Sequence, residues 1–223
     1  MPDVAIVDYG MGNLFSVKHA CEHVGLQAVI TASPQDVRAA HAVILPGVGA
    51  FGDAMATLRR LGLVEALREV AQSGTPLMGI CLGMQLLMTH SHEFGYHQGL
   101  GLVAGEVVRF DAPRQGATVL KVPHVGWNRI VRPPGGSWAS SGLEGLEDGA
   151  FMYFVHSFYA RPADAGVVVA RSRYGHIEFC SSLRDRNIFA CQFHPERSGP
   201  DGLQVYRNFA SQAHRPTRGV CHA

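Results

Sequence analysis

The sequence predicts an α/β fold in which helices flank a mostly parallel central sheet, with an additional antiparallel β portion. Two observations carry this prediction. Over the first ninety residues, short apolar runs alternate with helical patterns, and Gly, Pro, Asn or Asp marks each change. After residue 100, apolar β-type runs follow one another without intervening helices, which favours antiparallel pairing. We therefore expect one domain over residues 1–213 and a flexible tail over residues 214–223.

Strands and helices alternate in the first part of the chain. Strands are expected at residues 4–7, 28–30, 42–45 and 76–80. A first helix over residues 14–24 places its apolar residues on one face and ends at Gly25. Asp53 is expected to cap a second helix, which Gly62 interrupts. A third helical pattern follows the strand at 76–80 directly and continues to Met88.

The later part of the chain consists mainly of β-type runs, at residues 102–110, 119–122, 151–155, 167–170, 177–180 and 188–191. The Pro-, Gly- and Ser-rich stretch 132–142 is expected to be a surface loop, because strand patterns continue on both sides of it. Residues 203–209 are expected to form a closing helix.

Composition narrows the functional classes. The 223 residues carry a formal net charge of +1, which argues against a nucleic-acid or membrane-surface partner. The five cysteines include no C-x-x-C pair, so neither a disulfide framework nor a zinc ribbon is indicated, and we expect a reduced, cytoplasmic chain. No apolar run approaches the roughly 18 residues of a membrane span. Only 17% of residues are charged, which indicates a deeply buried core or a surface covered by another subunit.

Cys81 lies at the centre of the sharpest local motif, Gly-Ile-Cys-Leu-Gly at residues 79–83, between a predicted strand and a predicted helix. A nucleophile at such an elbow needs small residues on both sides of a tight turn, and glycine occupies both positions. The amino terminus of the following helix would favour a thiolate. The alternative is a buried structural cysteine beside two packing glycines.

A cysteine nucleophile needs a base, and the base needs a group that orients it. Gln-Phe-His-Pro-Glu at residues 192–196 supplies His194 and Glu196. Pro195 favours an extended backbone at His194, and side chains two residues apart in an extended segment point the same way. The alternative is a surface His and Glu beside a turn proline.

Residues 44–52 form a strand that leads into a loop with three glycines. Acyl chemistry at a thiolate needs two N–H donors for the oxyanion. The Leu82 N–H is one candidate, and an amide of Val48 or Gly49 is the other. A phosphate-binding loop is the weaker interpretation, because the Gly-Lys-Ser/Thr ending and the dinucleotide fingerprint are missing.

The remaining histidines indicate no metal site. His19 and His23, and the group His90, His92 and His97, lack the accompanying Cys or carboxylate spacing of a zinc site, so we expect solvated or polar-loop histidines. Two further histidines, His124 and His156, lie in β-rich surroundings and either face a cleft or satisfy hydrogen bonds in the core.

Taken together, the motifs at residues 46–49, 79–85 and 192–196 closely resemble those of the class I (triad) glutamine amidotransferases, whose fold is flavodoxin-like. The resemblance extends to about Phe209. Within that family it is strongest to the glutaminase subunits of imidazole glycerol phosphate synthase, in histidine biosynthesis. The segments that indicate this subgroup are residues 8–14, 47–51, 123–128 and 153–157.

The resemblance implies that Cys81 attacks the side-chain amide of L-glutamine, while His194, steered by Glu196, transfers protons. Glutamate and ammonia would be the products, and no cofactor is implied. The resemblance also implies which residues would hold glutamine: Gln85, Glu93 and the main chain near His156, Ser157 and Phe158. Glu93 is suited to the α-ammonium group of the substrate.

The resemblance also implies a heterodimer with a (β/α)8-barrel cyclase subunit, which receives the ammonia and forms imidazole glycerol phosphate and the aminoimidazole carboxamide ribotide. Asn13 and Trp127 would face this cyclase. The family usually has a basic residue where Phe15 stands. Three other functions are compatible with some of these motifs. The chain could be a glutaminase that serves another synthase, such as one for polysaccharide sugars. It could also be a non-catalytic member of the fold, or a cysteine hydrolase or peptidase.

Overall fold

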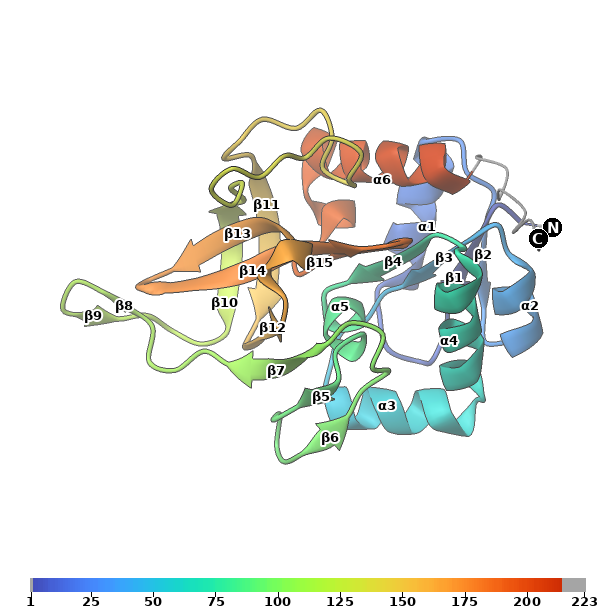
Figure 1. Cartoon of the computed structure of the whole chain (residues 1–223), viewed down its shortest axis with the longest axis horizontal. Helices are drawn as coiled ribbons and strands as arrows, with labels where there is room; N and C mark the ends of the chain where they lie inside the picture. The colour runs from blue at the N-terminus through green and yellow to red at the C-terminus, as the bar shows by residue number, and fades with distance from the viewer. Residues whose placement is uncertain (1, 214–223) are drawn as a thin grey trace.

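A seven-stranded sheet forms the centre of the computed structural model, which describes residues 2–213 (Figure 1). The strand order is β13-β14-β15-β4-β3-β1-β2. The bounds are β1 Val4–Val7, β2 Ala28–Thr31, β3 Ala42–Leu45, β4 Leu77–Ile80, β13 Val168–Tyr174, β14 Ile177–Asp185 and β15 Ile188–Cys191. The expected tail at 214–223 lies outside the described residues, and the single domain over residues 1–213 stays a prediction.

Five neighbouring strands, from β15 to β2, are parallel, and β14 and β13 continue the sheet in antiparallel pairing. Every residue of β1, β3, β4 and β15 is buried. Burial on both faces explains why these strands are continuous apolar runs in the sequence.

Helices cover both faces of the sheet (Figure 1). One face packs against α1 (Leu14–His23) and α6 (Gly199–Ala213), and the other packs against α2 (Pro34–Ala39), α3 (Phe51–Arg60), α4 (Leu63–Ser73) and α5 (Leu82–Leu86). Successive residues of β1 alternate between the two cores, because side chains along a strand point to opposite faces. The predicted α/β class with a mostly parallel sheet is confirmed.

Smaller sheets make up the antiparallel portion. A four-stranded sheet has the order β12-β7-β5-β6, and two pairs, β10 with β11 and β8 with β9, complete the strands of the described chain. Their bounds are β5 His90–Ser91, β6 His97–Gln98, β7 Gly105–Arg109, β8 Arg114–Gln115, β9 Thr118–Val119, β10 His124–Arg129, β11 Phe151–His156 and β12 Phe158–Pro162. Two 3-10 turns, η1 (Ala165–Val167) and η2 (Pro195–Arg197), lie among them in the chain.

Several predicted boundaries were wrong. Asp53 does not cap α3; Ala50 is the N-cap residue, without a side-chain hydrogen bond, and Asp53 lies in the first turn. The reason is a long-range contact, because the Phe51 N–H donates to the Glu93 carboxylate at 2.6 Å. The helix after Cys81 ends at Leu86 rather than at Met88. The prediction missed α2, β5, β6, β8, β10 and β12.

Two further expected segments are confirmed in the described part of the chain, the loop at 132–142 and the closing helix. Residues 132–142 contain no helix or strand, and α6 includes the predicted 203–209 but is longer at both ends. Four cysteines, Cys21, Cys81, Cys180 and Cys191, are buried and unpaired. Within residues 2–213, every helix is too short or too polar to cross a membrane.

Cys81 lies on a sharp turn between β4 and α5. Its backbone has φ 55° and ψ −110°, a conformation that L-residues rarely adopt. The glycines beside it are required by close packing. A Cβ on Gly83 would overlap the carbonyl oxygen of Leu45 in β3, and one on Gly79 would lie 3.0 Å from the Met84 nitrogen. Close packing against β3 therefore requires glycine at position 83, and position 79 has room for a Cβ only if its neighbours shift.

We expect Gly83→Ala to destabilise the protein by more than 2 kcal/mol, because backbone atoms of β3 would have to move. The control is Gly166→Ala on the surface, where the new Cβ would meet only the side chain of Asp164. Chemical denaturation of both variants measures the difference. Equal stabilities for the two variants would contradict the packing requirement.

Candidate active site

The parallel pairing of β4 with β15 brings Cys81 and His194 to the same edge of the central sheet. Ile80 pairs with Cys191, and the Cys81 N–H donates to the Cys191 carbonyl at 2.8 Å. Cys81 directly follows the carboxyl end of β4, and His194 lies three residues after that of β15, at the edge where open α/β sheets bind their ligands.

The Cys81 thiol is nearly enclosed, with 5% of the residue exposed. The Gln192 side-chain amide donates to its sulfur at 3.6 Å. The helix that follows, α5, has only five residues, so its dipole is weaker than the sequence led us to expect. His194 is the titratable group that interacts with the Cys81 sulfur.

His194 and Glu196 form a buried ion pair, in which the imidazole Nδ1 lies 2.8 Å from a carboxylate oxygen. His194 has the extended backbone expected before Pro195. Glu196, however, lies in the turn η2, so the predicted extended arrangement of the two residues was wrong. Pro195 begins this turn because its fixed φ suits the first position of a helix.

Charge interactions favour protonated His194. Burial lowers the pKa of the imidazole, but the charges and hydrogen bonds of Cys81 and Glu196 outweigh burial and raise the pKa to about 10. Since Glu196 occupies Nδ1, Nε2 is the ring nitrogen left for Cys81. The site therefore favours an imidazolium at His194, beside the sulfur of Cys81.

The glycine loop after β3 passes beside Cys81. The Leu82 N–H, a predicted oxyanion donor, donates to the Gly47 carbonyl at 3.3 Å. The first residue of the loop, Pro46, is held in place because its carbonyl accepts a hydrogen bond from the buried Tyr9 hydroxyl at 2.8 Å. Val48 is 43% exposed and also lines the cavity at Cys81.

A cavity of about 300 Å³ opens at Cys81. This volume is at the lower end of the range for small-molecule sites, roughly 300–1,000 Å³. The residues that line it are Val48, Gly49, Cys81, Leu82, Gln85, Glu93, Pro123, Val155, His156, Ser157 and Phe158. The structure thus brings every predicted oxyanion and glutamine-binding residue to one cavity.

Gln85 and Glu93 are fixed by hydrogen bonds. The Gln85 amide nitrogen donates to the Phe158 carbonyl at 2.9 Å and to the Gln192 side chain at 3.0 Å. Burial raises the pKa of Glu93, while the Phe51 N–H and His97 oppose this. One Glu93 oxygen accepts from Phe51, so the other is left to accept a hydrogen bond from a cation in the cavity.

His156 directs its side chain into a histidine network in the core. Its Nδ1 lies 2.8 Å from the Phe158 carbonyl and therefore donates, so its Nε2 accepts from His124 Nδ1 at 3.1 Å. Burial lowers the pKa of His156 to about 3 and that of His124 to about 4. Both rings are neutral at physiological pH and position β11 and β10 rather than titrate.

The two predicted partner-facing residues lie outside the cavity. Asn13 is exposed and caps α1, where its side chain accepts from the Ser16 N–H at 3.4 Å. Trp127 on β10 is 56% exposed and packs against Tyr153, with ring centroids 6.1 Å apart. Both α1 and β11, the partner strand of β10, pack against η2.

Sequence reasoning missed two residues that organise the site, Tyr9 and Gln192. Gln192 lies two residues before His194 in the same motif, and this position could have indicated that its side chain lies near the base. The role of Tyr9 depends on a contact with Pro46, 37 residues away in the chain, which no local pattern indicates.

Comparisons with known proteins agree with this geometry. The family model described as glutamine amidotransferase class-I matches residues 5–213. A protein from Geobacter metallireducens named imidazole glycerol phosphate synthase subunit HisH is 52% identical over 213 residues, which are 94% of this chain and 98% of that protein. One of the same name from Rhodopirellula baltica is 45% identical over 93% of this chain and 97% of its own length.

Solved structures share the fold. A structure described as a glutamine amidotransferase has a TM-score of 0.70 at 21% identity, and covers 94% of this chain and 98% of its own. PurLQS from Thermotoga maritima likewise has a TM-score of 0.70 at 21% identity, and covers 95% and 99%. Since the family model spans residues 5–213 and the curated relatives align along nearly the whole chain, this chain belongs to the class-I glutamine amidotransferase family.

Proposed function

We propose that the chain is the glutaminase subunit of an imidazole glycerol phosphate synthase. It hydrolyses L-glutamine to glutamate and ammonia, and the ammonia passes to a cyclase subunit. The observation that carries this proposal is the buried row of Cys81, His194 and Glu196 at a small cavity. The relatives that match along nearly the full length support the pathway, histidine biosynthesis.

Cys81 is the proposed nucleophile. Its thiolate sulfur bonds to the carboxamide carbon of glutamine, and the carbonyl electrons move to oxygen. His194 Nε2 then protonates the leaving nitrogen, so ammonia departs and a thioester remains. The same nitrogen takes a proton from water, which attacks the thioester and releases glutamate. Glu196 holds the imidazole in place and stabilises its cation throughout.

The oxyanion would be held by the Leu82 N–H and an amide of Val48 or Gly49. In the present conformation, the Gly47 carbonyl accepts the Leu82 N–H. Rotation of the Gly47–Val48 peptide would release this donor and would turn the Val48 N–H in the opposite direction. Glutamine hydrolysis therefore requires a change in this peptide, which exposed Val48 makes accessible to a partner.

Glutamine would lie along the cavity with its α-ammonium group at Glu93. Burial and the hydrogen bond to Phe51 fix this carboxylate. Gln85 holds the Phe158 carbonyl, so the main chain of His156, Ser157 and Phe158 is presented to the substrate. No cofactor takes part in this reaction.

The proposed partner is a (β/α)8-barrel cyclase that docks over Asn13 and Trp127 to form a heterodimer in the cytoplasm. Large apolar side chains are exposed on the elements that carry these two residues. Phe15 in α1 is 73% exposed, and Val125 in β10 is 56% exposed. A covered face of this kind would let ammonia pass without meeting bulk water.

Cys81→Ala tests the central proposal. In the complex with the cyclase, we expect glutamine-dependent synthesis to fall by more than about a thousandfold, since no other group can form the thioester. Ammonia-dependent synthesis should be unchanged, because the cyclase performs it. Cys21→Ala, which removes another buried cysteine, is the matched control and should retain glutamine-dependent activity. Glutamine-dependent activity in Cys81→Ala would refute the proposal.

Glu196→Gln tests the orienting carboxylate. The amide can still accept from His194 Nδ1 but carries no charge, so the imidazolium is less stable and the pKa of His194 should fall. We expect glutamine hydrolysis to drop roughly 10²–10⁴-fold. Steady-state kinetics and ¹⁵N NMR of the imidazole measure the two effects, with exposed Glu147→Gln as control. Near-normal turnover would remove Glu196 from the triad.

Trp127→Ala tests the docking face. Large aromatic residues at the centre of an interface contribute much of the binding energy, so we expect cyclase affinity to weaken roughly tenfold or more. Isothermal calorimetry with the purified cyclase measures this affinity. Val29→Ala on the edge strand β2 is the control for removal of exposed apolar area. Equal affinities for the two variants would place the interface elsewhere.

A further inference from the structure

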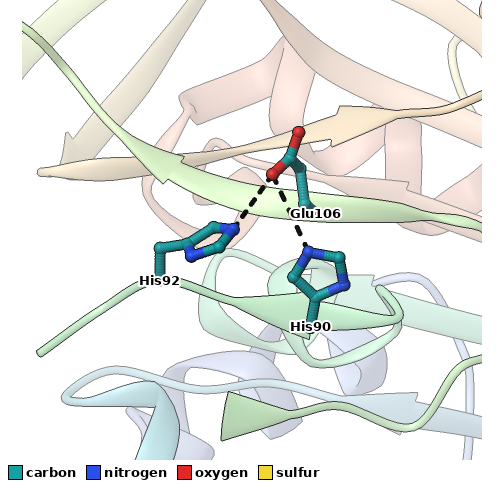
Figure 2. Close-up of side chains that lie close together, drawn as sticks. All are labelled: His90, His92 and Glu106. Carbon is teal, nitrogen blue, oxygen red and sulfur yellow. Dashed lines mark hydrogen bonds and ion pairs between the residues drawn. The ribbon is translucent and has the colours of Figure 1, made fainter. Parts of the chain in front are cut away.

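Three side chains with metal-ligating atoms converge on one face of the four-stranded sheet: His90, His92 and Glu106 (Figure 2). The strand β5 runs parallel to β7 and places His90 opposite Glu106. The chain continues this pairing beyond β5, since the His92 N–H donates to the Val107 carbonyl at 3.1 Å. His92 lies two residues after His90 and therefore points to the same face.

The two imidazoles approach the same carboxylate oxygen. His92 Nε2 lies 3.1 Å and His90 Nε2 lies 3.8 Å from Glu106 Oε2, and all three atoms are within 4.8 Å of one another. Ligands of a tetrahedral zinc ion, with bonds of about 2.0–2.1 Å, lie roughly 3.3 Å apart. The observed spacing needs only small side-chain rotations to match it.

Neighbouring residues hold this group in place. Arg161 donates to the other carboxylate oxygen of Glu106, Oε1, through two nitrogens, so Oε2 is left for the histidines. Tyr96 stacks on His90 with ring centroids 5.2 Å apart. Such outer contacts orient the ligands of metal sites.

We propose that His90, His92 and Glu106 form a binding site for a divalent transition-metal ion of the zinc, cobalt or nickel class. Two imidazole nitrogens with one carboxylate oxygen favour these ions over magnesium or calcium, which prefer oxygen ligands alone. Three protein ligands leave a position for water. The site is separate from Cys81, His194 and Glu196, and so the inference is independent of the proposed function.

The bound ion would link β5 to β7 at the rim of the cavity beside Cys81. Glu93, which lines that cavity, follows His92 directly in the chain. A second hollow beside the cluster includes His92 and Glu106 and shares Ser157 and Phe158 with the cavity at Cys81. The strand β5 has only two residues, so a metal bond across it would stabilise the segment that carries Glu93.

The sequence indicated no such site, because the carboxylate is distant from both histidines. Glu106 lies 14 residues after His92 and reaches it only through the pairing of β5 with β7. The expectation of solvated or polar-loop histidines was wrong for His90, which lies in strand β5 with 27% of its side chain exposed. His92 lies beyond that strand with 52% of its side chain exposed, as expected, and both contact Glu106.

Zinc titration of the full chain, without a purification tag and freed of metal by a chelator, tests the proposal. Cys81→Ala is used as the parent protein, so that the thiolate of the active site cannot bind the ion. Calorimetry should give saturable binding of one zinc ion at the cluster, together with a zinc-dependent rise in Tm. His90→Ala, His92→Ala and Glu106→Gln should each weaken this binding at least tenfold. His41→Ala, which removes an exposed histidine at another position, should leave it unchanged.

Cobalt absorption spectra identify the ligands. Cobalt bound by nitrogen and oxygen should show visible ligand-field bands without intense thiolate charge-transfer absorption, and His92→Ala should abolish these bands. The His90 side chain is 27% exposed and that of His92 is 52% exposed, so we expect both variants to fold; if one does not, the other variants still test the site. No saturable binding in the parent protein, or equal binding in the parent and all folded variants, would overturn the proposal and leave an ion-pair network of Glu106 with Arg161 and His92 only.

Discussion

The parallel pairing of β4 with β15 is the constraint on which the candidate active site depends. It aligns Ile80 with Cys191, and the Cys81 N–H extends the ladder by one further hydrogen bond. Two segments more than a hundred residues apart thereby end side by side, one with the nucleophile candidate and one with the base. Because β3 pairs with the other side of β4, the glycine loop is delivered to the same edge.

The main chain beside the buried His194 and Glu196 pair is held by hydrogen bonds on both sides of His194. The His194 N–H donates to the Tyr153 carbonyl, and the Ser198 hydroxyl donates to the His194 carbonyl while it accepts from the Tyr153 N–H. Removal of one partner from a buried ion pair costs about 3–5 kcal/mol, because the other charge is left unpaired. The neutral pair of His124 and His156 holds β10 and β11 nearby without adding a charge.

Sequence reasoning succeeded where structure is local or fully buried. The bounds of β1, β3 and β15 follow from short runs in which every residue is buried, and Cys81, His194 and Glu196 are flanked by residues that their turns require. Sequence reasoning failed where a residue far away in the chain makes a hydrogen bond that a neighbouring residue was expected to make. The start of α3 was misplaced because Glu93, rather than Asp53, accepts the Phe51 N–H. Half-exposed strands such as β10 and β12 lack the continuous apolar run of a buried strand.

The low content of charged residues has two compatible explanations in the structure. Both faces of the central sheet are covered by helices, which creates two buried clusters within one chain and requires many apolar residues. Large apolar side chains also remain exposed at Phe15, Val125 and Trp127.

Under the proposed function, an exposed apolar face that a partner covers has a catalytic consequence. Val48 is exposed and also lines the cavity, and its peptide bond to Gly47 carries the carbonyl that occupies the Leu82 N–H. A subunit that covers Val48 therefore acts on the same peptide that withholds an oxyanion donor, so docking and glutamine hydrolysis share one structural element.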